Sequence, residues 1–336
     1  MATYNGERFI REQMDSLARQ TYLPSELVVT DDGSTDRTLE IIEDFAKTAP
    51  FSVRVYRNEQ NLGYADNFLK AASLCEGEWI AFCDQDDVWL EKKLEIISGY
   101  FQLSPDIYLI THSAVLVDEK LVPLKRIFPH HVTTKVVERL EGRFWYTLYG
   151  FTAVFRREVV AAIPWQKRPT DFTDTENKKM QSHDLWVYFL CSCLGKVVLL
   201  SDKLVLYRRH SAALTGYYCG TRIDRLNAIL HSGFSHYRFL AGIVREYEDT
   251  LLVLADDSKI DIIYRQKLRQ AAQFMRVMSV QTNNRSLIHS QSVGFVRRAR
   301  GFLENIKIQI KTSSGDFSTK TFIKDMLAVF GLWRFI

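Results

Sequence analysis

The stretch Glu26-Leu-Val-Val-Thr-Asp-Asp-Gly-Ser-Thr-Asp36 joins a short apolar run to a polar loop with two adjacent aspartates. The run is typical of a buried strand, and Asp36 is expected to be the N-cap of a following helix. A second apolar stretch, Glu78–Cys83, runs directly into Asp84. Apolar strands that end in acidic residues predict a sheet with its functional groups along one edge.

Short β-rich runs alternate with helical patterns around these stretches, which predicts an α/β fold with a mostly parallel, twisted sheet flanked by helices. The expected strands are residues 26–30, 52–56, 78–83, 107–117 and 203–207, and the expected helices are residues 7–20, 67–74, 90–101 and 185–194. Ligands of such sheets bind beyond the carboxyl ends of the strands. We therefore expect Thr3-Tyr4-Asn5, Asp31-Asp32 and Asp84-Gln85-Asp86-Asp87 to converge there.

The first of these loops, Thr3-Tyr4-Asn5-Gly6, follows only Met1 and Ala2. Either the strand before it is almost absent, or the natural chain begins upstream of Met1. Loss of a central strand would expose apolar sheet surface at a cost of several kcal/mol. We therefore expect an incomplete N-terminus.

Composition excludes several classes of protein. The chain has 336 residues, of which 46% are hydrophobic and 25% charged, as in ordinary globular proteins. A formal net charge of +4 is too small for a dedicated nucleic-acid binder, so no nucleic-acid partner is expected. The sequence has no apolar run long enough to span a bilayer and no signal peptide. Its five cysteines contain no C-x-x-C pair, which favours a reducing, cytoplasmic compartment.

The strand pattern stops near residue 215, so two domains are expected, residues 1–215 and residues 216–336. The second is expected to contain helices at 223–254, 260–280 and 287–310, followed by an apolar, aromatic tail at 328–336. The segment 285–311 contains a single acidic residue, Glu304. Its basic residues are six, namely Arg285, Arg297, Arg298, Arg300, Lys307 and Lys311. Residues 285–336 therefore have two interpretations: peripheral contact with an anionic membrane, or a helical subdomain whose cations face water.

The acidic cluster after Cys83 suits a metal. Asp84, Asp86 and Asp87 would repel one another unless a cation offsets their charge. Carboxylate oxygens suit Mg²⁺ or Mn²⁺, which often also bind substrate phosphates. The alternative is a solvated turn that caps the next helix. The sequence contains neither a G-x-G-x-x-G fingerprint nor a P-loop, so a phosphate would be held by the metal.

Asp31-Asp32 and Asp184 can each be interpreted as functional or as structural residues. Asp31 and Asp32 could accept from a nucleobase or ribose, or could form an Asx-turn into the next helix. Asp184 opens an apolar helix, where the helix dipole stabilises its carboxylate and makes it a candidate base. The alternative is an N-cap, and His183 could orient Asp184, contact substrate or neighbour the cap. His210, after Arg208-Arg209, is a candidate metal ligand, although an isolated histidine is more often structural.

Together, these segments resemble the inverting family 2 glycosyltransferases of the GT-A fold. The resemblance covers residues 1–215 and is carried by Ala2-Thr-Tyr-Asn-Gly6, Glu26–Asp36, Asn61-Leu-Gly63, Asp84-Gln-Asp-Asp87, Gly150-Phe-Thr-Ala-Val-Phe155 and His183-Asp184. It implies a nucleotide-sugar donor, a divalent cation and one displacement with inversion at the anomeric carbon.

With the resemblance added, each candidate residue has an expected role. The expected nucleotide ligands are Thr3, Tyr4, Asn5, Asp31, Asp32, Asn61 and Asp84. The expected ligands of Mg²⁺ or Mn²⁺ are Asp84, Asp86 and His210, and the expected catalytic residues are Asp184, as the base, and His183. The family more often has Glu-Asp at this last position, which leaves the role of His183 open.

The DQDDVW form and the HD-x-W element look most like bacterial rhamnosyltransferases of lipopolysaccharide core or O-antigen synthesis. This resemblance implies transfer of L-rhamnose from dTDP-rhamnose to a hydroxyl of a glycan or lipid-linked glycan. The alternatives are a hexosyltransferase using UDP-glucose, UDP-galactose or a UDP-N-acetylhexosamine, a non-catalytic nucleotide-sugar or glycan scaffold, and a metal-dependent nucleotidyltransferase.

Overall fold

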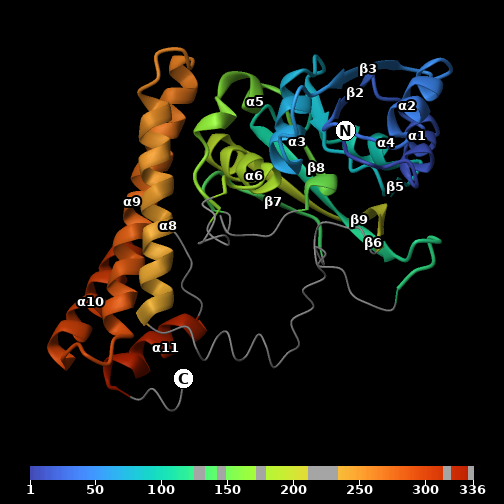
Figure 1. Ribbon diagram of the computed structural model, residues 1–336. Coiled ribbons are helices and arrows are strands. Elements are labelled where there is room, and N and C mark those ends of the chain that lie inside the picture. The colour runs from blue at the N-terminus through green and yellow to red at the C-terminus, as the bar shows by residue number, and fades with distance from the viewer. Residues whose placement is uncertain (125–132, 142–148, 172–178, 211–233, 313–318, 332–336) are drawn as a thin grey trace. The chain divides into compact units, whose positions relative to one another are not determined.

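The computed structural model describes residues 1–124, 133–141, 149–171, 179–210, 234–312 and 319–331 (Figure 1). The chain divides into two compact units, Met1–Leu214 and Thr215–Ile336. None of the helices in the described ranges combines the length and the hydropathy needed to cross a bilayer.

A parallel three-stranded sheet begins the first unit. Its strands are β1 (Ala2–Thr3), β2 (Glu26–Asp31) and β3 (Ser52–Arg57), with β2 in the centre. Helices α1 (Ile10–Ala18), α2 (Thr38–Ala46) and α3 (Tyr64–Ser73) follow the strands in turn. The strand before the first loop is thus present but only two residues long, and it pairs with β2 through Ala2↔Thr30 and Thr3↔Asp31.

The start of α2 differs from the expected cap. Arg37 is the N-cap, and Asp36 lies one residue before it. Asp36 Oδ1 still accepts a hydrogen bond from the Thr38 amide at 3.0 Å, so it satisfies a free N–H of the first turn from outside the helix.

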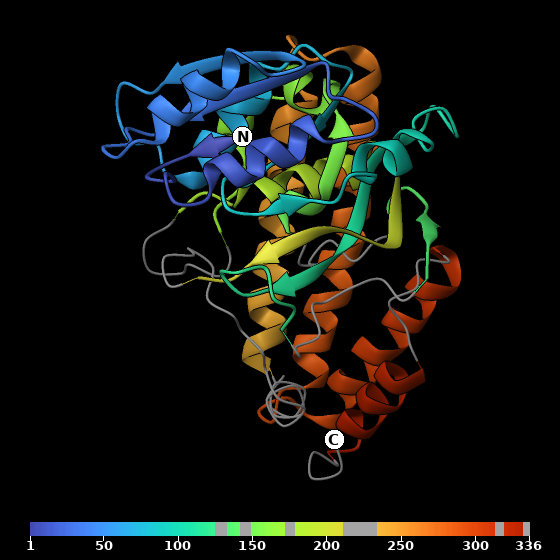
Figure 2. The same ribbon diagram turned by 90° about the vertical axis from the view of Figure 1, so that its right-hand side faces the viewer.

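The second sheet has six strands and mixed directions. Its order is β4 (Trp79–Ala81), β8 (Ala153–Arg156), β6 (Ile107–Val117), β9 (Lys196–Arg208) and β5 (Val88–Trp89), with β7 (Lys135–Val137) also on β9. The long strands β6 and β9 run parallel and side by side, whereas the other pairs are antiparallel (Figure 2). Apolar runs identify strands but carry no direction, so the sequence did not indicate these antiparallel pairs.

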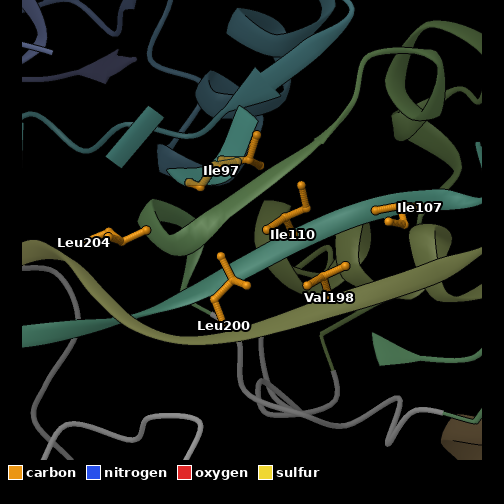
Figure 3. Close-up of a cluster of buried hydrophobic side chains, with 7 residues drawn as sticks. Ile97, Ile107, Ile110, Val198, Leu200 and Leu204 are labelled. Carbon is orange, nitrogen blue, oxygen red and sulfur yellow. The ribbon is translucent and has the colours of Figure 1, made fainter. Parts of the chain in front are cut away.

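One apolar cluster joins a helix to this sheet. Ile97 of α4 (Lys93–Ser98) packs against Ile110 and Leu200 of the two long strands (Figure 3). Helix α6 (His183–Leu194) is buried along most of its length, which explains why its apolar residues show no single face. The short helix α5 (Glu158–Ala162) contacts α6. This packing holds the loops at the strand ends in place.

The second unit is helical. It contains α8 (Phe234–Ala255), α9 (Ile262–Ile288), α10 (Phe295–Thr312) and α11 (Thr319–Val329). The expected single helix over 287–310 is wrong at its start, because α9 continues to Ile288 and α10 begins only at Phe295, after the Ser-Gln-Ser-Val-Gly segment 290–294. Residues 223–233 of the first expected helix and residues 332–336 of the aromatic tail lie outside the described residues.

Candidate active site

The first loop and the acidic loop lie side by side. Gln85 makes two hydrogen bonds to Tyr4: its Oε1 accepts from the Tyr4 amide at 3.0 Å, and its Nε2 donates to the Tyr4 carbonyl at 3.1 Å. Thr3 Oγ1 donates to Asp31 Oδ2 at 2.9 Å. The Asn5 amide donates to Ser34 Oγ at 2.9 Å, with the Asn5 backbone at φ 47°. The structure therefore brings the three polar clusters together.

Asp31 has the geometry of the structural alternative. It is fully buried, and its Oδ1 accepts from the amides of Gly33 and Ser34 at 3.1 and 2.8 Å, which is an Asx-turn. Its Oδ2 accepts from Thr3 and from Ser34 Oγ. Because both oxygens accept hydrogen bonds from the protein, Asp31 shapes the loop, and its role as a nucleotide ligand stays a prediction.

Asp32 organises the turn at Asn61. Its Oδ1 accepts from the Leu62 amide and from Asn58 Nδ2, both at 2.8 Å, and its Oδ2 accepts from the Gly63 amide at 2.9 Å. Asn61 Nδ2 donates to the Asp32 carbonyl at 3.0 Å, and the side chain of Asn61 is exposed. Asp32 is buried, as Asp31 is, and its role as a nucleotide ligand stays a prediction.

Asp84, Asp86 and Asp87 form what we call the acidic triad. Each offers a ligand oxygen, and these oxygens lie within 4.8 Å of one another. Burial, followed by the charges of Asp86 and Asp184, raises the pKa of Asp84 to about 8. Burial also raises the pKa of Asp87 well above its usual value. Asp87 Oδ1 accepts from the Arg208 amide at 3.0 Å, whereas Oδ2 is buried without a partner.

These features fit a hard divalent cation. A set of carboxylate oxygens is the donor set that Mg²⁺ and Mn²⁺ prefer. The unpartnered Asp87 Oδ2 and the raised pKa of Asp84 both indicate negative charge that the protein leaves unbalanced. The expected set contained Asp84, Asp86 and His210, and the geometry adds Asp87 to it.

His210 reaches the triad through Asp86. Its Nε2 lies 2.7 Å from Asp86 Oδ2, its ring packs on Phe9 at 4.7 Å, and Nδ1 is buried without a partner. Arg208 donates to the Asp86 carbonyl at 2.7 Å and pairs with Glu12. In this arrangement His210 orients Asp86, and direct metal ligation by His210 remains a prediction.

A buried cation lies beneath the triad. Lys93, the first residue of α4, is completely buried, and its Nζ donates to the Phe151 carbonyl at 2.9 Å and lies 3.5 Å from the centre of the Trp89 ring. Burial lowers the pKa of Lys93 to about 7, against the opposite effects of Asp87 and Asp84. Lys93 thus ties the triad loop to the segment after Gly150.

Asp184 is close enough to the triad to raise the pKa of Asp84. It stands in the first turn of α6, whose N-cap is Ser182, so the N-cap alternative for Asp184 is not what the structure shows. Its Oδ1 accepts from Ser182 Oγ at 2.6 Å and from the Leu185 amide at 2.8 Å. Its charge also raises the pKa values of Tyr64 and Tyr149, after burial. These effects indicate that the Asp184 carboxylate lies within electrostatic range of Asp84, Tyr64 and Tyr149.

His183 points into an aromatic pocket. Its ring stacks on Phe68 at 4.2 Å and meets Phe82 edge-on at 4.8 Å, and both ring nitrogens are buried without partners. Burial lowers the pKa of His183 to about 4, so the ring is neutral at pH 7. A Cβ at Gly150 would lie 2.5 Å from His183 Nε2, which explains the glycine there. This geometry favours positioning over proton transfer.

Two of the residues missed from the sequence have roles that depend on burial. Asp87 was in the quoted cluster, but its position before the buried strand β5 sets it apart only in three dimensions. Lys93 gave no signal, because a lysine in a helix is usually solvated. Gln85 was quoted with the acidic cluster, but its residue type did not indicate its two hydrogen bonds to Tyr4.

Comparison with known proteins agrees with this geometry. Residues 1–163 match the model of the family described as Glycosyl transferase family 2. This match covers just under half of the chain. Similar proteins include an uncharacterized glycosyltransferase of Nostoc sp. that is 28% identical over 217 residues, covering 63% of this chain and 64% of that protein. The dTDP-rhamnosyl transferase RfbG of Shigella flexneri is 37% identical over 99 residues, 28% of this chain and 34% of that protein.

Two further matches concern an uncharacterized relative and a solved structure. An uncharacterized protein of Mycobacterium tuberculosis is 26% identical over 213 residues. The match covers 62% of this chain and 57% of that protein, so the chain spans little more than half the length of this relative. The structure of Staphylococcus aureus TarS 1–349 with UDP-GlcNAc aligns over 94% of this chain and 91% of that chain, with a TM-score of 0.53 and 18% identity. This likeness shows the fold, which is GT-A, with a helical region after it.

Proposed function

We propose that this protein is an inverting glycosyltransferase that moves a sugar from a nucleotide donor to a hydroxyl group of a glycan. The observation that carries the proposal is the acidic triad with Asp184 beside it, at the edge where the first loop and the Asp32 loop meet. This reaction needs carboxylates that bind a cation and a separate carboxylate that accepts a proton. The acidic triad would bind the cation, and Asp184 at the start of α6 would accept the proton.

Each group has a definite task in the proposed reaction. Tyr4, Asn5, Asp32 and Asn61 contact the nucleoside, and Thr3 supports their loop through Asp31. When bound, Mg²⁺ or Mn²⁺ on the triad neutralises the charge of the leaving nucleoside diphosphate. Asp184 accepts the proton of the acceptor hydroxyl as its oxygen forms the new bond to the anomeric carbon. That bond and the broken bond to the diphosphate lie on opposite faces, so the configuration is inverted.

The proposed donor is dTDP-L-rhamnose. Its support is the similarity to the dTDP-rhamnosyl transferase RfbG, together with 33% identity over 109 residues to the abequosyltransferase RfbV of Salmonella typhimurium, which covers 33% of that protein. Both similarities cover only part of the chain, so UDP-glucose, UDP-galactose and UDP-N-acetylhexosamines are the alternatives to be tested.

The proposed acceptor is a cell-envelope glycan, such as lipopolysaccharide core or O-antigen on a lipid carrier. A lipid-linked acceptor would place the enzyme in the cytoplasm at the inner membrane, in peripheral contact through residues 285–336. This segment carries an excess of basic residues, and positive charge is attracted to anionic lipids, which supports the proposal.

A panel of nucleotide sugars tests the reaction. Each donor is added with Mn²⁺ or Mg²⁺, and the midpoint of thermal unfolding is measured, since a ligand that binds the folded state raises it. We expect dTDP-rhamnose to give the largest shift and chelation to remove it. Release of nucleoside diphosphate is then measured with the best donor and candidate acceptors.

Three results would contradict the proposal. Turnover that persists under chelation would exclude the metal's role. Donor binding without release of nucleoside diphosphate for any acceptor would favour a non-catalytic scaffold. Release of pyrophosphate from a nucleoside triphosphate and a sugar 1-phosphate, with no turnover of nucleotide sugars, would favour a nucleotidyltransferase.

A further inference from the structure

Helix α10 is anchored to the helical unit along one face. Asn305 on this face donates to the Gln281 carbonyl at 3.2 Å and accepts from Asn284 Nδ2 at 3.0 Å. Gly301, one turn earlier, is buried against Asn284 and Ile288 of α9. These contacts fix the rotation of α10 about its own axis, so the opposite face is presented in a defined orientation.

The opposite face carries large apolar side chains in solvent. We call it the α10 patch; it lines an open groove and consists of Phe295, Val296, Ala299, Arg300, Leu303, Glu304 and Lys307. Val296 is 80% exposed, Leu303 56% and Phe295 50%. Val296, Arg300, Leu303 and Lys307 are spaced by four, three and four residues, which aligns their side chains along one helix face. The apolar side chains are therefore contiguous, unlike singly scattered exposed residues.

Cations border the apolar part of the patch. The Arg300 side chain is 81% exposed, and Lys307 is exposed one turn beyond Leu303. Glu304 pairs with Arg300 at 3.3 Å, but an exposed pair of this kind is weak in water and can separate near a stronger anion. Arg297, also exposed, adds positive charge next to the patch.

We propose that the α10 patch docks on an anionic lipid surface. Val296, Leu303 and Phe295 enter the boundary between head groups and acyl chains, while Arg300 and Lys307 extend to the lipid phosphates. The proposal deepens the proposed function by naming the surface that brings the enzyme to a lipid-linked acceptor, and it rests on that function only for its purpose.

Charge distinguishes a lipid surface from a second copy of this chain. A two-fold contact through the patch would bring two copies of the same net-positive surface together, with Glu304 as the acid of each patch against Arg300 and Lys307. A sheet of lipid phosphates instead complements both cations and also receives the apolar side chains.

The test measures sedimentation of the full chain with vesicles. One set contains phosphatidylglycerol and phosphatidylethanolamine, and the other contains only phosphatidylcholine. The variants are Leu303→Asp and the pair Arg300→Gln/Lys307→Gln. Their matched controls are Val253→Asp on α8, which is also 56% exposed, and Arg276→Gln, an exposed cation of α9. Thermal unfolding and donor binding are recorded for every variant.

We expect binding to the anionic vesicles that weakens as NaCl is raised, and no binding to phosphatidylcholine. Leu303→Asp should weaken binding about tenfold, and the double cation variant about thirtyfold at low salt. The controls should bind like the wild type, and donor binding should be unchanged throughout.

Several outcomes would overturn the proposal. These are the absence of vesicle binding, binding that ignores salt or lipid charge, and equal losses in Leu303→Asp and Val253→Asp. A dimer that Leu303→Asp dissociates, without vesicle binding, would assign the patch to a second copy. Because donor binding is measured in parallel, failure of the docking proposal leaves the proposed reaction standing, and failure of donor binding would refute that reaction separately.

Discussion

The raised pKa of Asp84 predicts how metal binding depends on pH. At pH 7 an isolated aspartate is ionised, but burial and the charges of Asp86 and Asp184 raise the pKa of Asp84 to about 8. A carboxyl group must lose its proton to ligate a cation, so Mn²⁺ binding at pH 6 has to displace that proton. Affinity should therefore increase with pH up to about pH 8 and then level off.

The magnitude follows from the distance between the assay pH and the pKa. Two pH units below the pKa, the ionised fraction is about 1%, so the dissociation constant of Mn²⁺ at pH 6 should exceed its limiting value about 100-fold, equivalent to about 2.7 kcal/mol. Asp87, whose pKa is also raised, would steepen the dependence if it ligates the cation as well.

The sign for stability is opposite in the metal-free protein. A carboxyl group whose pKa is raised on folding stabilises the folded state fully below its unfolded pKa, near 4, and loses that contribution as pH rises through 8. His183, with its lowered pKa, and Lys93, with a pKa lowered to about 7, add changes of their own between pH 4 and 6.5 and above pH 7. The free energy of unfolding is therefore compared at each pH between the metal-bound and the metal-free protein. Contributions that both forms share cancel in this difference.

Isothermal titration calorimetry tests the prediction. Mn²⁺ is titrated at several pH values between 6 and 8.5, in two buffers of different ionisation enthalpy, which gives the number of protons released. Asp84→Asn should bind more weakly and lose most of the pH dependence. A dissociation constant that is flat across this range, with no proton released, would refute the assignment of Asp84 as a ligand with a raised pKa.

Three further predictions follow. Asp184→Asn should lower kcat about 10²–10⁴-fold and leave the dissociation constant of the donor unchanged in calorimetry; normal turnover would exclude Asp184 as the base. Gly150→Ala should destabilise the fold by about 1–3 kcal/mol, because its Cβ would meet His183 at 2.5 Å; the cost measured by urea unfolding should shrink in a His183→Ala background, and equal costs would disprove the contact. Asp325→Ala should lower the free energy of unfolding by about 3–5 kcal/mol, because Asp325 is fully buried and lies 3.2 Å from Arg285 and 2.9 Å from His289. A loss below about 1 kcal/mol in urea unfolding would show that these interactions are solvated.

Long apolar runs were predictable from sequence. Strand β6 has the bounds expected from its pattern, Ile107–Val117, and β2 exceeds its expected range by one residue, Asp31. Runs of this length carry enough β-branched and apolar residues to specify a strand without tertiary information. The polar clusters that follow the strands lie together because topology, rather than local sequence, decides where strand ends meet.

The elements that the sequence did not indicate are short or depend on tertiary contacts. Strand β5 is the dipeptide Val88–Trp89, too short to show a period, yet its pairing with β9 buries the residue before it, Asp87. The boundary between α9 and α10 falls in the segment 290–294, whose two serines and glycine are weak helix formers, but the helical spacing of apolar residues on both sides hid this break. The structural reading of Asp31 and the functional reading of Asp84 cannot be separated by residue type, because both are aspartates after an apolar strand.

What separates them is how their charges are balanced. Asp31 is surrounded by amide and hydroxyl donors, which balance its charge without any ion. Asp84 shares its site with other carboxylates, and the nearby ammonium of Lys93 has its own pKa lowered to about 7 by burial. The raised pKa values of Asp84 and Asp87 favour a protonated carboxyl group where the protein supplies no full positive charge. Because a dication could replace such a proton and also bind a diphosphate, this electrostatic imbalance supports the acidic triad as the proposed chemical centre.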